Sequence, residues 1–202
     1  MLHEPNRDDM EQHLELLFRP ARGKIDHHIE FRALGNSYPK TWTTTPDADG
    51  IDKAITRAIE YNEDGHNVYV MVNPVNPIKL AKPGQSNSAS DNDIVCAYYA
   101  FADADTEESS VRLRYAASRP NFIVVTGTQP FERLHAYWQL EEAIDLTAWR
   151  ELQTYIIQAM GTDRSIINPS RIMRLAGSVT YPDKAKRDKG YCSELVRLEV
   201  TK

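Results

Sequence analysis

Segments with the pattern of β-strands alternate with segments with the pattern of α-helices, and this alternation constrains the fold more than any other feature. Helical segments carry apolar residues three and four positions apart, whereas strand segments are short apolar runs bounded by turn residues. The expected helices are residues 8–18, 49–65, 106–117 and 147–160. The expected strands are residues 28–34, 40–45, 68–72, 94–105, 122–126, 133–140 and 193–200. This interleaved order predicts an α/β or α+β protein.

Turn and cap residues divide these segments. Asp49 or Asp52 is the expected cap of the second helix, with Gly65 as its stop, and Gly161 ends the last helix. The polar stretch KPGQSNSASDND at 82–93 is the clearest loop. We therefore expect two small modules, about residues 1–90 and 91–202, that share one compact unit.

Composition excludes several classes of protein. The chain has 202 residues, and no apolar run reaches the roughly 18–20 residues that span a bilayer. Cys96 and Cys192 lie outside any CxxC pattern, which argues against a zinc ribbon, and a reducing, cytoplasmic setting without a membrane partner is expected. The patterns of P-loop NTPases, dinucleotide-binding folds and serine hydrolases do not occur.

Charge is unevenly distributed along the chain. The 24 Lys and Arg against 29 Asp and Glu give a net charge of −5, which by itself argues against a nucleic-acid partner. Residues 164–190, however, hold seven basic residues against two acidic ones. That segment therefore carries +5 and the remainder −10, a distribution typical of a chain that binds an anion beside a carboxylate site.

The stretch IVCAYYAFADADTEE holds two aspartates two positions apart. Side chains of a strand alternate between faces, so Asp103 and Asp105 emerge on the same face, roughly 6–7 Å apart. Two carboxylates at this spacing suit a hard divalent cation, which prefers oxygen ligands. The alternative is a pair of solvated acids that lead into a helix N-terminus at Thr106.

The stretch RLHAYWQL alternates strictly between apolar and polar residues, as a strand covered on one side does. Its apolar face holds Leu134, Ala136, Trp138 and Leu140, and its polar face holds Arg133, His135, Tyr137 and Gln139. If this strand pairs with 94–105 with the polar faces aligned, His135 lies close to the two aspartates. The alternative is a partly exposed histidine without a function.

The third feature is MGTDRSIINPSRIMRLAGSVTYPDK at 160–184. Asp163 follows the helix stop, and the spacing of Arg171 and Arg174 predicts that they share one face of a short helical turn. Basic residues near a carboxylate cluster indicate an anionic ligand held opposite a metal. The alternative is a solvated basic loop.

In this order, the three features resemble the three motifs of the archaeo-eukaryotic primase superfamily, most closely its RepB-like plasmid and phage branch, which includes primase-polymerases. Gaps of 32 and 28 residues separate Asp103, His135 and Asp163. The match covers residues 65–200 well and 1–64 loosely. Arg133 stands where the family often has a small residue, and the asparagine expected after the third motif's glycine is not evident in GSVTYP.

The resemblance implies that residues 1–202 form one primase catalytic core of the α+β class, with an N-terminal α/β module packed on an RRM-like module of mixed or antiparallel sheet. It implies template-directed nucleotidyl transfer on single-stranded DNA in plasmid or phage replication. Asp103, Asp105 and Asp163 would hold two Mg²⁺ or Mn²⁺ ions. The residues that would contact the incoming triphosphate are Arg133, His135, Arg171 and Arg174.

The partners that the resemblance implies are a single-stranded DNA template, ribo- or deoxynucleoside triphosphates, and a helicase or accessory domain, in trans or on a longer chain. The template would lie along a basic groove, contacted by residues 184–189 and by the loop at 82–93.

A second hypothesis is a non-catalytic single-strand binder with an RRM-like sheet, on which Tyr99, Phe101 and Tyr137 would stack bases. Asp103 and Asp105 discriminate between the two, because without a metal they would repel phosphates. A metal-dependent nuclease or relaxase ranks below both, since two histidines in ligand spacing are missing.

Overall fold

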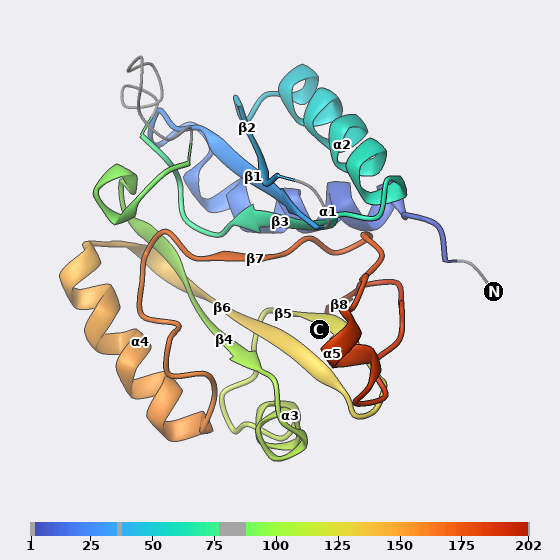
Figure 1. The fold of residues 1–202 in the computed structure, drawn as a ribbon. Coiled ribbons are helices and arrows are strands. Elements are labelled where there is room, and N and C mark those ends of the chain that lie inside the picture. Colours follow the sequence, from blue (N-terminus) through green and yellow to red (C-terminus); the bar gives the residue numbers. More distant parts are fainter. Residues whose placement is uncertain (1–2, 36–37, 77–87, 202) are drawn as a thin grey trace.

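The computed structural model describes residues 3–35, 38–76 and 88–201, and within them the strands form two four-stranded antiparallel sheets (Figure 1). The first sheet has the order β2-β1-β3-β7, and the second has the order β4-β6-β5-β8. The strands of the first sheet are β1 (Ile29–Leu34), β2 (Lys40–Thr44), β3 (Asn67–Met71) and β7 (Ile172–Arg174). Those of the second are β4 (Ala97–Ala104), β5 (Phe122–Gly127), β6 (Arg133–Ile144) and β8 (Arg197–Val200).

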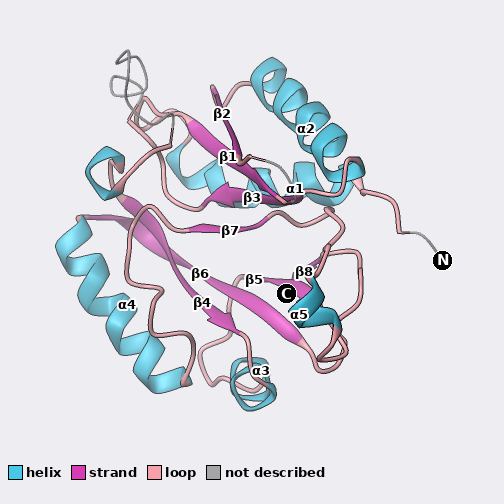
Figure 2. Ribbon diagram, viewed as in Figure 1, coloured by secondary structure: helices cyan, strands magenta, loops and turns pink. Residues whose placement is uncertain are grey.

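Helices pack against both sheets (Figure 2). The described helices are α1 (Arg7–Phe18), α2 (Ala48–Glu63), α3 (Glu107–Arg114), α4 (Leu146–Met160) and α5 (Lys184–Arg187). Short 3-10 turns occur at Arg19–Ala21 and Asp91–Asp93. The predicted α+β class is confirmed, and α1 to α4 coincide with the four predicted helices to within a few residues.

The ends of the helices follow from local capping. Asp47 caps α2, because its carboxylate accepts a hydrogen bond from the Gly50 N–H at 2.8 Å. The expected cap at Asp49 or Asp52 is therefore wrong, since both lie inside the helix. At the end of α4, Gly161 has a φ of 64°, a left-handed conformation that glycine adopts without steric cost, so the predicted stop there is confirmed.

The short strand β7 is the main difference from the predicted elements. The sequence pattern favours a helical turn at Arg171 and Arg174, but residues 172–174 pair antiparallel with β3, with Arg174 opposite Tyr69. Figure 1 shows β7 running between β3 and the second sheet. Three residues are too few for a periodic signal, so the neighbouring strand rather than the local sequence decides this conformation.

One large core lies between the sheets and is shared by them. It contains Leu14 and Leu17 of α1, Phe31 of the first sheet, and Phe122 and Tyr137 of the second. A smaller cluster packs α3 and α4 on the other face of the second sheet. Residues 133–137 are consequently buried on both faces. The expectation that this strand is covered on one side is wrong there, because α1 and the first sheet cover the polar face.

Strand β4 lies at one edge of the second sheet, and α4 closes that edge. The Gln153 amide accepts from the Phe101 N–H at 3.3 Å and donates to the Phe101 carbonyl. Trp149 Nε1 donates to the Tyr99 carbonyl at 2.8 Å. These side chains occupy the backbone groups that a further strand would pair with, so they protect the edge and hold β4 in place.

The chain crosses between the sheets more than once. Although β7 comes from the C-terminal half, it completes the first sheet, so the division into modules 1–90 and 91–202 stays a prediction. Part of the loop predicted at 82–93 lies outside the described residues, and its end forms the turn at Asp91–Asp93. In the described part of the chain, none of the helices has the length and apolarity that crossing a membrane requires.

Candidate active site

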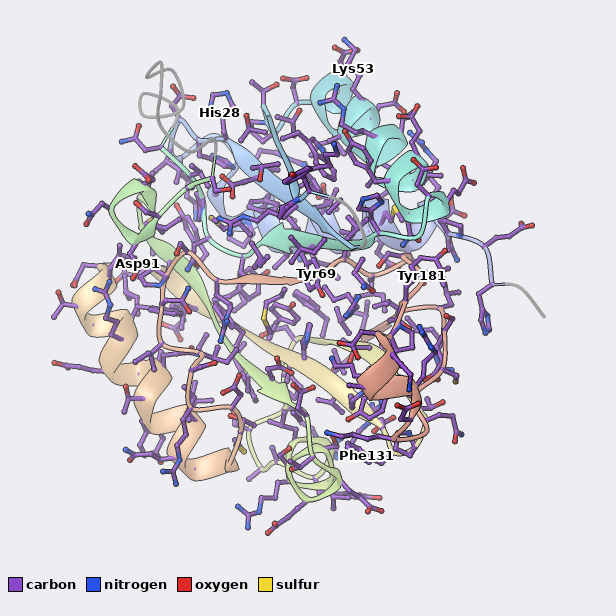
Figure 3. All side chains as sticks on the ribbon, in the orientation of Figure 1. His28, Lys53, Tyr69, Asp91, Phe131 and Tyr181 are labelled. Atoms are coloured by element: carbon purple, nitrogen blue, oxygen red, sulfur yellow. The ribbon has the colours of Figure 1, made fainter. Side chains whose placement is uncertain are left out.

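One cleft, of about 470 Å³, gathers all the site residues selected from the sequence. The first sheet contributes its β3 and β7 side, and the second sheet contributes the ends of β4 and β6. Figure 3 labels Tyr69 and Tyr181, which also line this cleft. The selected residues in its lining are Asp103, Asp105, Arg133, His135, Asp163, Arg171 and Arg174.

Strands β4 and β6 bring the first two motifs together. They pair antiparallel, with Asp103 directly opposite His135, so the condition under which His135 lies close to the aspartates is met. His135 Nε2 lies 3.6 Å from Asp103 Oδ1, too far for a hydrogen bond. Asp105 lies just beyond the end of β4 and is exposed. The acidic pair therefore stands where β4 opens into the cleft.

The turn after α4 brings Asp163 to the same place. Its backbone N–H donates to the Asp103 carbonyl at 3.2 Å, which attaches the turn to the end of β4. Its carboxylate accepts from the Ser165 N–H at 2.8 Å and from the Ser165 hydroxyl at 2.7 Å. Arg171 Nη2 lies 3.7 Å from the same carboxylate. The Asp163 side chain thus stabilises its own turn while it faces the cleft.

The protonation of the site follows from burial and from mutual repulsion. Burial, followed by the charges of Asp105 and Asp163, raises the pKa of Asp103 to about 8. Burial, followed by the positive charge of Arg174, lowers the pKa of His135 to about 3. At neutral pH Asp103 is therefore mostly protonated and His135 is neutral, so the two do not form an ion pair.

The carboxylates have the right chemistry for a hard cation but are not arranged as a ligand set. In the described ranges, no three His, Cys, Asp or Glu side chains come close enough together to hold a metal. Three carboxylates nevertheless face one cleft, and carboxylate oxygens are the ligands that Mg²⁺ and Mn²⁺ prefer. After burial, the charges of Asp105 and Asp163 raise the pKa of Asp103, and the same charges would attract a cation placed among the three carboxylates. The donor chemistry of this cleft therefore fits such an ion, although the described side chains do not surround one.

The opposite wall of the cleft is basic. Arg174 lies over the Tyr69 ring, with its guanidinium carbon 4.9 Å from the ring centre, and donates to the Tyr69 hydroxyl at 3.1 Å. Its other terminal nitrogen donates to Asn67 Oδ1 at 2.6 Å. Arg171 donates to the Ser165 hydroxyl at 2.6 Å. Both arginines are only partly buried, so their charge is available at the cleft.

Arg133 also reaches the cleft, but its guanidinium already has several partners. It donates to the carbonyls of Gln129 and Phe131, the latter at 3.1 Å. It lies 3.5 Å from the Glu194 carboxylate and 4.2 Å from the centre of the Tyr191 ring. These contacts hold the loop between β5 and β6 against the 191–194 segment. A role for Arg133 in nucleotide binding stays a prediction.

The second hypothesis, base stacking on an exposed aromatic sheet face, is wrong for the residues it named. Tyr99, Phe101 and Tyr137 are at most 1% exposed and pack between the two sheets. Alternation along a strand shows which side chains share a face, but not whether that face is covered. The three aromatic side chains are core residues.

Several cleft residues escaped the sequence analysis. Asn67 and Tyr69 belong to β3, and residues 180–183 form part of the rim. A polar residue at the start of a strand and a tyrosine inside one are common, so neither gave a signal. They reach the cleft because β7, more than 100 positions further along the chain, pairs with β3.

Among solved structures, the chain has the fold of an archaeo-eukaryotic primase (AEP) domain. The AEP domain of the cyanophage S-2L primase-polymerase (PrimPol) is similar, with a TM-score of 0.65 and 25% identity over 98% of this chain and 92% of that chain.

Two structures of the primase RepB′ share the fold. One has a TM-score of 0.60 and 12% identity over 92% of this chain and 55% of that chain. The other, the RepB′ catalytic domain in complex with initiator DNA, has a TM-score of 0.56 and 13% identity over 91% and 83% of the two chains. No protein-family model and no curated protein matches the sequence.

Proposed function

We propose that this chain is the catalytic domain of a DNA primase or primase-polymerase, which performs template-directed, metal-dependent nucleotidyl transfer on single-stranded DNA in plasmid or phage replication. The observation that carries the proposal is the convergence of seven residues, chosen from three separate sequence motifs, on one cleft. The similarity to a phage primase-polymerase domain and to RepB′ primase supports it.

The acidic wall would hold the metal. Asp103, Asp105 and Asp163 would bind two Mg²⁺ or Mn²⁺ ions, and Asp163 would then exchange part of its bonding to Ser165 for a cation. Such ions activate a 3′-hydroxyl and neutralise charge on the triphosphate and the leaving pyrophosphate. The chain itself holds these carboxylates in fixed positions, because β6 and the turn after α4 both form hydrogen bonds with the end of β4.

The basic wall would hold the triphosphate. Arg174 and Arg171 line the same cleft as the carboxylates, with Arg171 Nη2 3.7 Å from Asp163, and the planar guanidinium fork suits phosphate oxygens. His135, neutral at pH 7, would donate a hydrogen bond to the substrate without adding charge. The nucleotide would thus lie between the two walls, with its phosphates toward the metal side.

The template would approach along the basic rim at α5. Lys184, Lys186, Arg187 and Lys189 are exposed, and Lys186 also lines the cleft. Lysine and arginine side chains beside an active site attract a nucleic-acid backbone whatever its sequence. The similarity to a RepB′ catalytic domain in complex with initiator DNA favours DNA as the strand bound here. A helicase or accessory domain remains part of the proposal as a partner.

The direct test is synthesis on single-stranded DNA with labelled ribo- or deoxynucleotides and Mn²⁺ or Mg²⁺, resolved on a denaturing gel. New labelled oligonucleotides are expected for a primase, and extension of a supplied primer alone for a polymerase. Asp103→Ala with Asp105→Ala should abolish both. The matched control is Glu141→Ala with Glu142→Ala, which removes two exposed carboxylates from the far end of β6. Synthesis that survives in the aspartate variant would refute the proposal.

A non-catalytic single-strand binder remains the alternative outcome. It would bind DNA without synthesis, and its nucleotide affinity would not depend on metal. Calorimetric titration of a nucleoside triphosphate with and without Mg²⁺ or Mn²⁺ separates the two functions.

A further inference from the structure

We propose that Asn67, with the help of Tyr69, is a positioning residue that fixes Arg174 in the orientation needed to bind the triphosphate. This inference rests on the proposed function and assigns to β3 a part in nucleotide binding. Asn67 and Tyr69 are two positions apart on β3, so both side chains point to the cleft side of the strand.

Both terminal nitrogens of Arg174 are held by β3. One donates to Asn67 Oδ1 at 2.6 Å, and the other donates to the Tyr69 hydroxyl at 3.1 Å. The guanidinium carbon also lies 4.9 Å from the centre of the Tyr69 ring, within the range of a cation–π contact. An arginine side chain has many rotamers, and these contacts select one of them before a ligand arrives.

Asn67 also fastens the rim of the cleft. Its Oδ1 accepts from the Tyr181 N–H at 2.8 Å, and its Nδ2 donates to the Tyr181 carbonyl at 2.9 Å. The amide oxygen has two lone pairs, and the structure uses one for Tyr181 and the other for Arg174. A single side chain therefore fixes Arg174 relative to the 180–183 segment, which lines the same cleft.

A second asparagine provides a matched control for the rim. Asn62 Oδ1 accepts from the Val179 N–H at 2.7 Å, and Asn62 Nδ2 donates to the Val179 carbonyl at 2.8 Å. Its amide group thus holds residue 179 as Asn67 holds residue 181. In the described part of the chain its further hydrogen bond goes to the His66 carbonyl and not to Arg174. Asn62 shares the structural task of Asn67 without the contact to arginine.

The tyrosines provide a milder pair of variants. Tyr69→Phe and Tyr181→Phe each remove one hydroxyl from the cleft lining and keep the ring. Within the described residues, only the Tyr69 hydroxyl accepts a hydrogen bond from Arg174. A difference between these two variants therefore reports on Arg174 rather than on packing.

The decisive experiment is a double-mutant cycle on the whole chain, with ATP and dATP titrated separately by calorimetry in the presence of Mn²⁺. We expect Asn67→Ala to weaken binding about tenfold and Arg174→Ala to weaken it more. If Asn67 acts through Arg174, the double variant should bind like Arg174→Ala alone. In the control cycle, which combines Asn62→Ala with Arg174→Ala, the two losses of nucleotide affinity should multiply. In synthesis assays, Asn67→Ala should raise KM and leave kcat nearly unchanged.

Suppose that the wild type binds nucleotide and that the affinity losses of Asn67→Ala and Arg174→Ala multiply. That result would overturn the inference. A wild type that binds neither nucleotide would overturn the proposed function as well, so the two failures are distinguishable. Should an asparagine variant not fold, the tyrosine pair decides: equal affinities of Tyr69→Phe and Tyr181→Phe would contradict a positioning role for β3. Circular dichroism of each variant establishes its folding.

Discussion

The Asp103–His135 pair on one wall of the cleft and Arg174 on the other differ in how completely their polar groups are satisfied. On the second-sheet wall, Asp103 and His135 stand 3.6 Å apart without a hydrogen bond, and His135 Nδ1 has no partner within the described residues. On the first-sheet wall, Arg174 has a partner for each terminal nitrogen. The Asp103–His135 pair is thus costly without a ligand, whereas Arg174 is already ordered; Arg171 Nε, beside it, has no hydrogen-bond partner within the described residues.

This difference indicates which ligand each wall is suited to bind. Burial, followed by repulsion from Asp105 and Asp163, raises the pKa of Asp103, and a cation is the partner that would offset this repulsion. A preorganised arginine loses little rotamer freedom when it binds phosphate, so its contribution to affinity is larger. We therefore expect substitutions on the acidic wall to change catalysis and stability in opposite directions, and substitutions on the basic wall to change mainly affinity.

The largest expected effect comes from Asp103→Asn. The amide cannot supply the charge that a cation needs, so synthesis should fall at least about a thousandfold. The same change removes a poorly solvated carboxylate, so the metal-free variant should be more stable than the wild type at pH 9. Denaturing gels and urea unfolding measure the two quantities. A variant that is both inactive and less stable at pH 9 would show that Asp103 is not strained.

The next effect is a pH dependence of folding in the metal-free chain. Burial lowers the pKa of His13 and of His135 from 6.5 to about 3, so below pH 6.5 the unfolded state binds protons that the folded state does not. Together the two histidines should lower the free energy of unfolding by about 3 kcal/mol between pH 6.5 and pH 5.

The raised pKa of Asp103 changes the free energy of unfolding with pH in the opposite direction to the two histidines. Its folded state binds more protons between pH 3.8 and about 8, so its stabilising contribution is complete below pH 3.8 and is lost as the pH rises to 8. Asp103→Asn should therefore lose more stability than the wild type when the pH falls from 6.5 to 5. The variant should also lose less stability than the wild type when the pH rises from 6.5 to 8. Identical urea-unfolding profiles for the two chains would contradict this account.

Metal should stabilise the folded wild type. A cation that binds the folded state alone adds about 2.7 kcal/mol at a concentration of 100 times its Kd. We expect Mn²⁺ to raise the unfolding temperature of the wild type and to do little for Asp103→Asn, and a chelator should reverse the shift. Equal shifts in both chains would place the bound cation elsewhere.

The smallest expected effect is that of Arg174→Lys on the basic wall. Lysine keeps the charge, but all its donors sit on one nitrogen, so it does not reproduce the two separate nitrogens that Arg174 directs at Asn67 and Tyr69. Nucleotide affinity should fall about tenfold, with the metal-induced stabilisation unchanged. A loss of that stabilisation would show that the two walls are not independent.

Much of the fold was predictable because its determinants are local. The apolar spacing in α2 and the strict alternation in β6 are periodic signals of sufficient length. Gly161 ends α4 because its backbone adopts a left-handed conformation. The pairing of β4 with β6 was stated only as a condition, and the register of Asp103 with His135 satisfies it.

The sequence by itself determined the residue types, the strand and helix periods, and the positions of the carboxylates, the histidine and the arginines. The tertiary structure alone decided that residues 172–174 form a strand, that Asn67 and Tyr69 reach the cleft, and that Tyr99, Phe101 and Tyr137 are buried. The physical reason is that periodicity encodes which side chains share a face. What covers that face depends on partners far away in the chain, as β3 depends on β7.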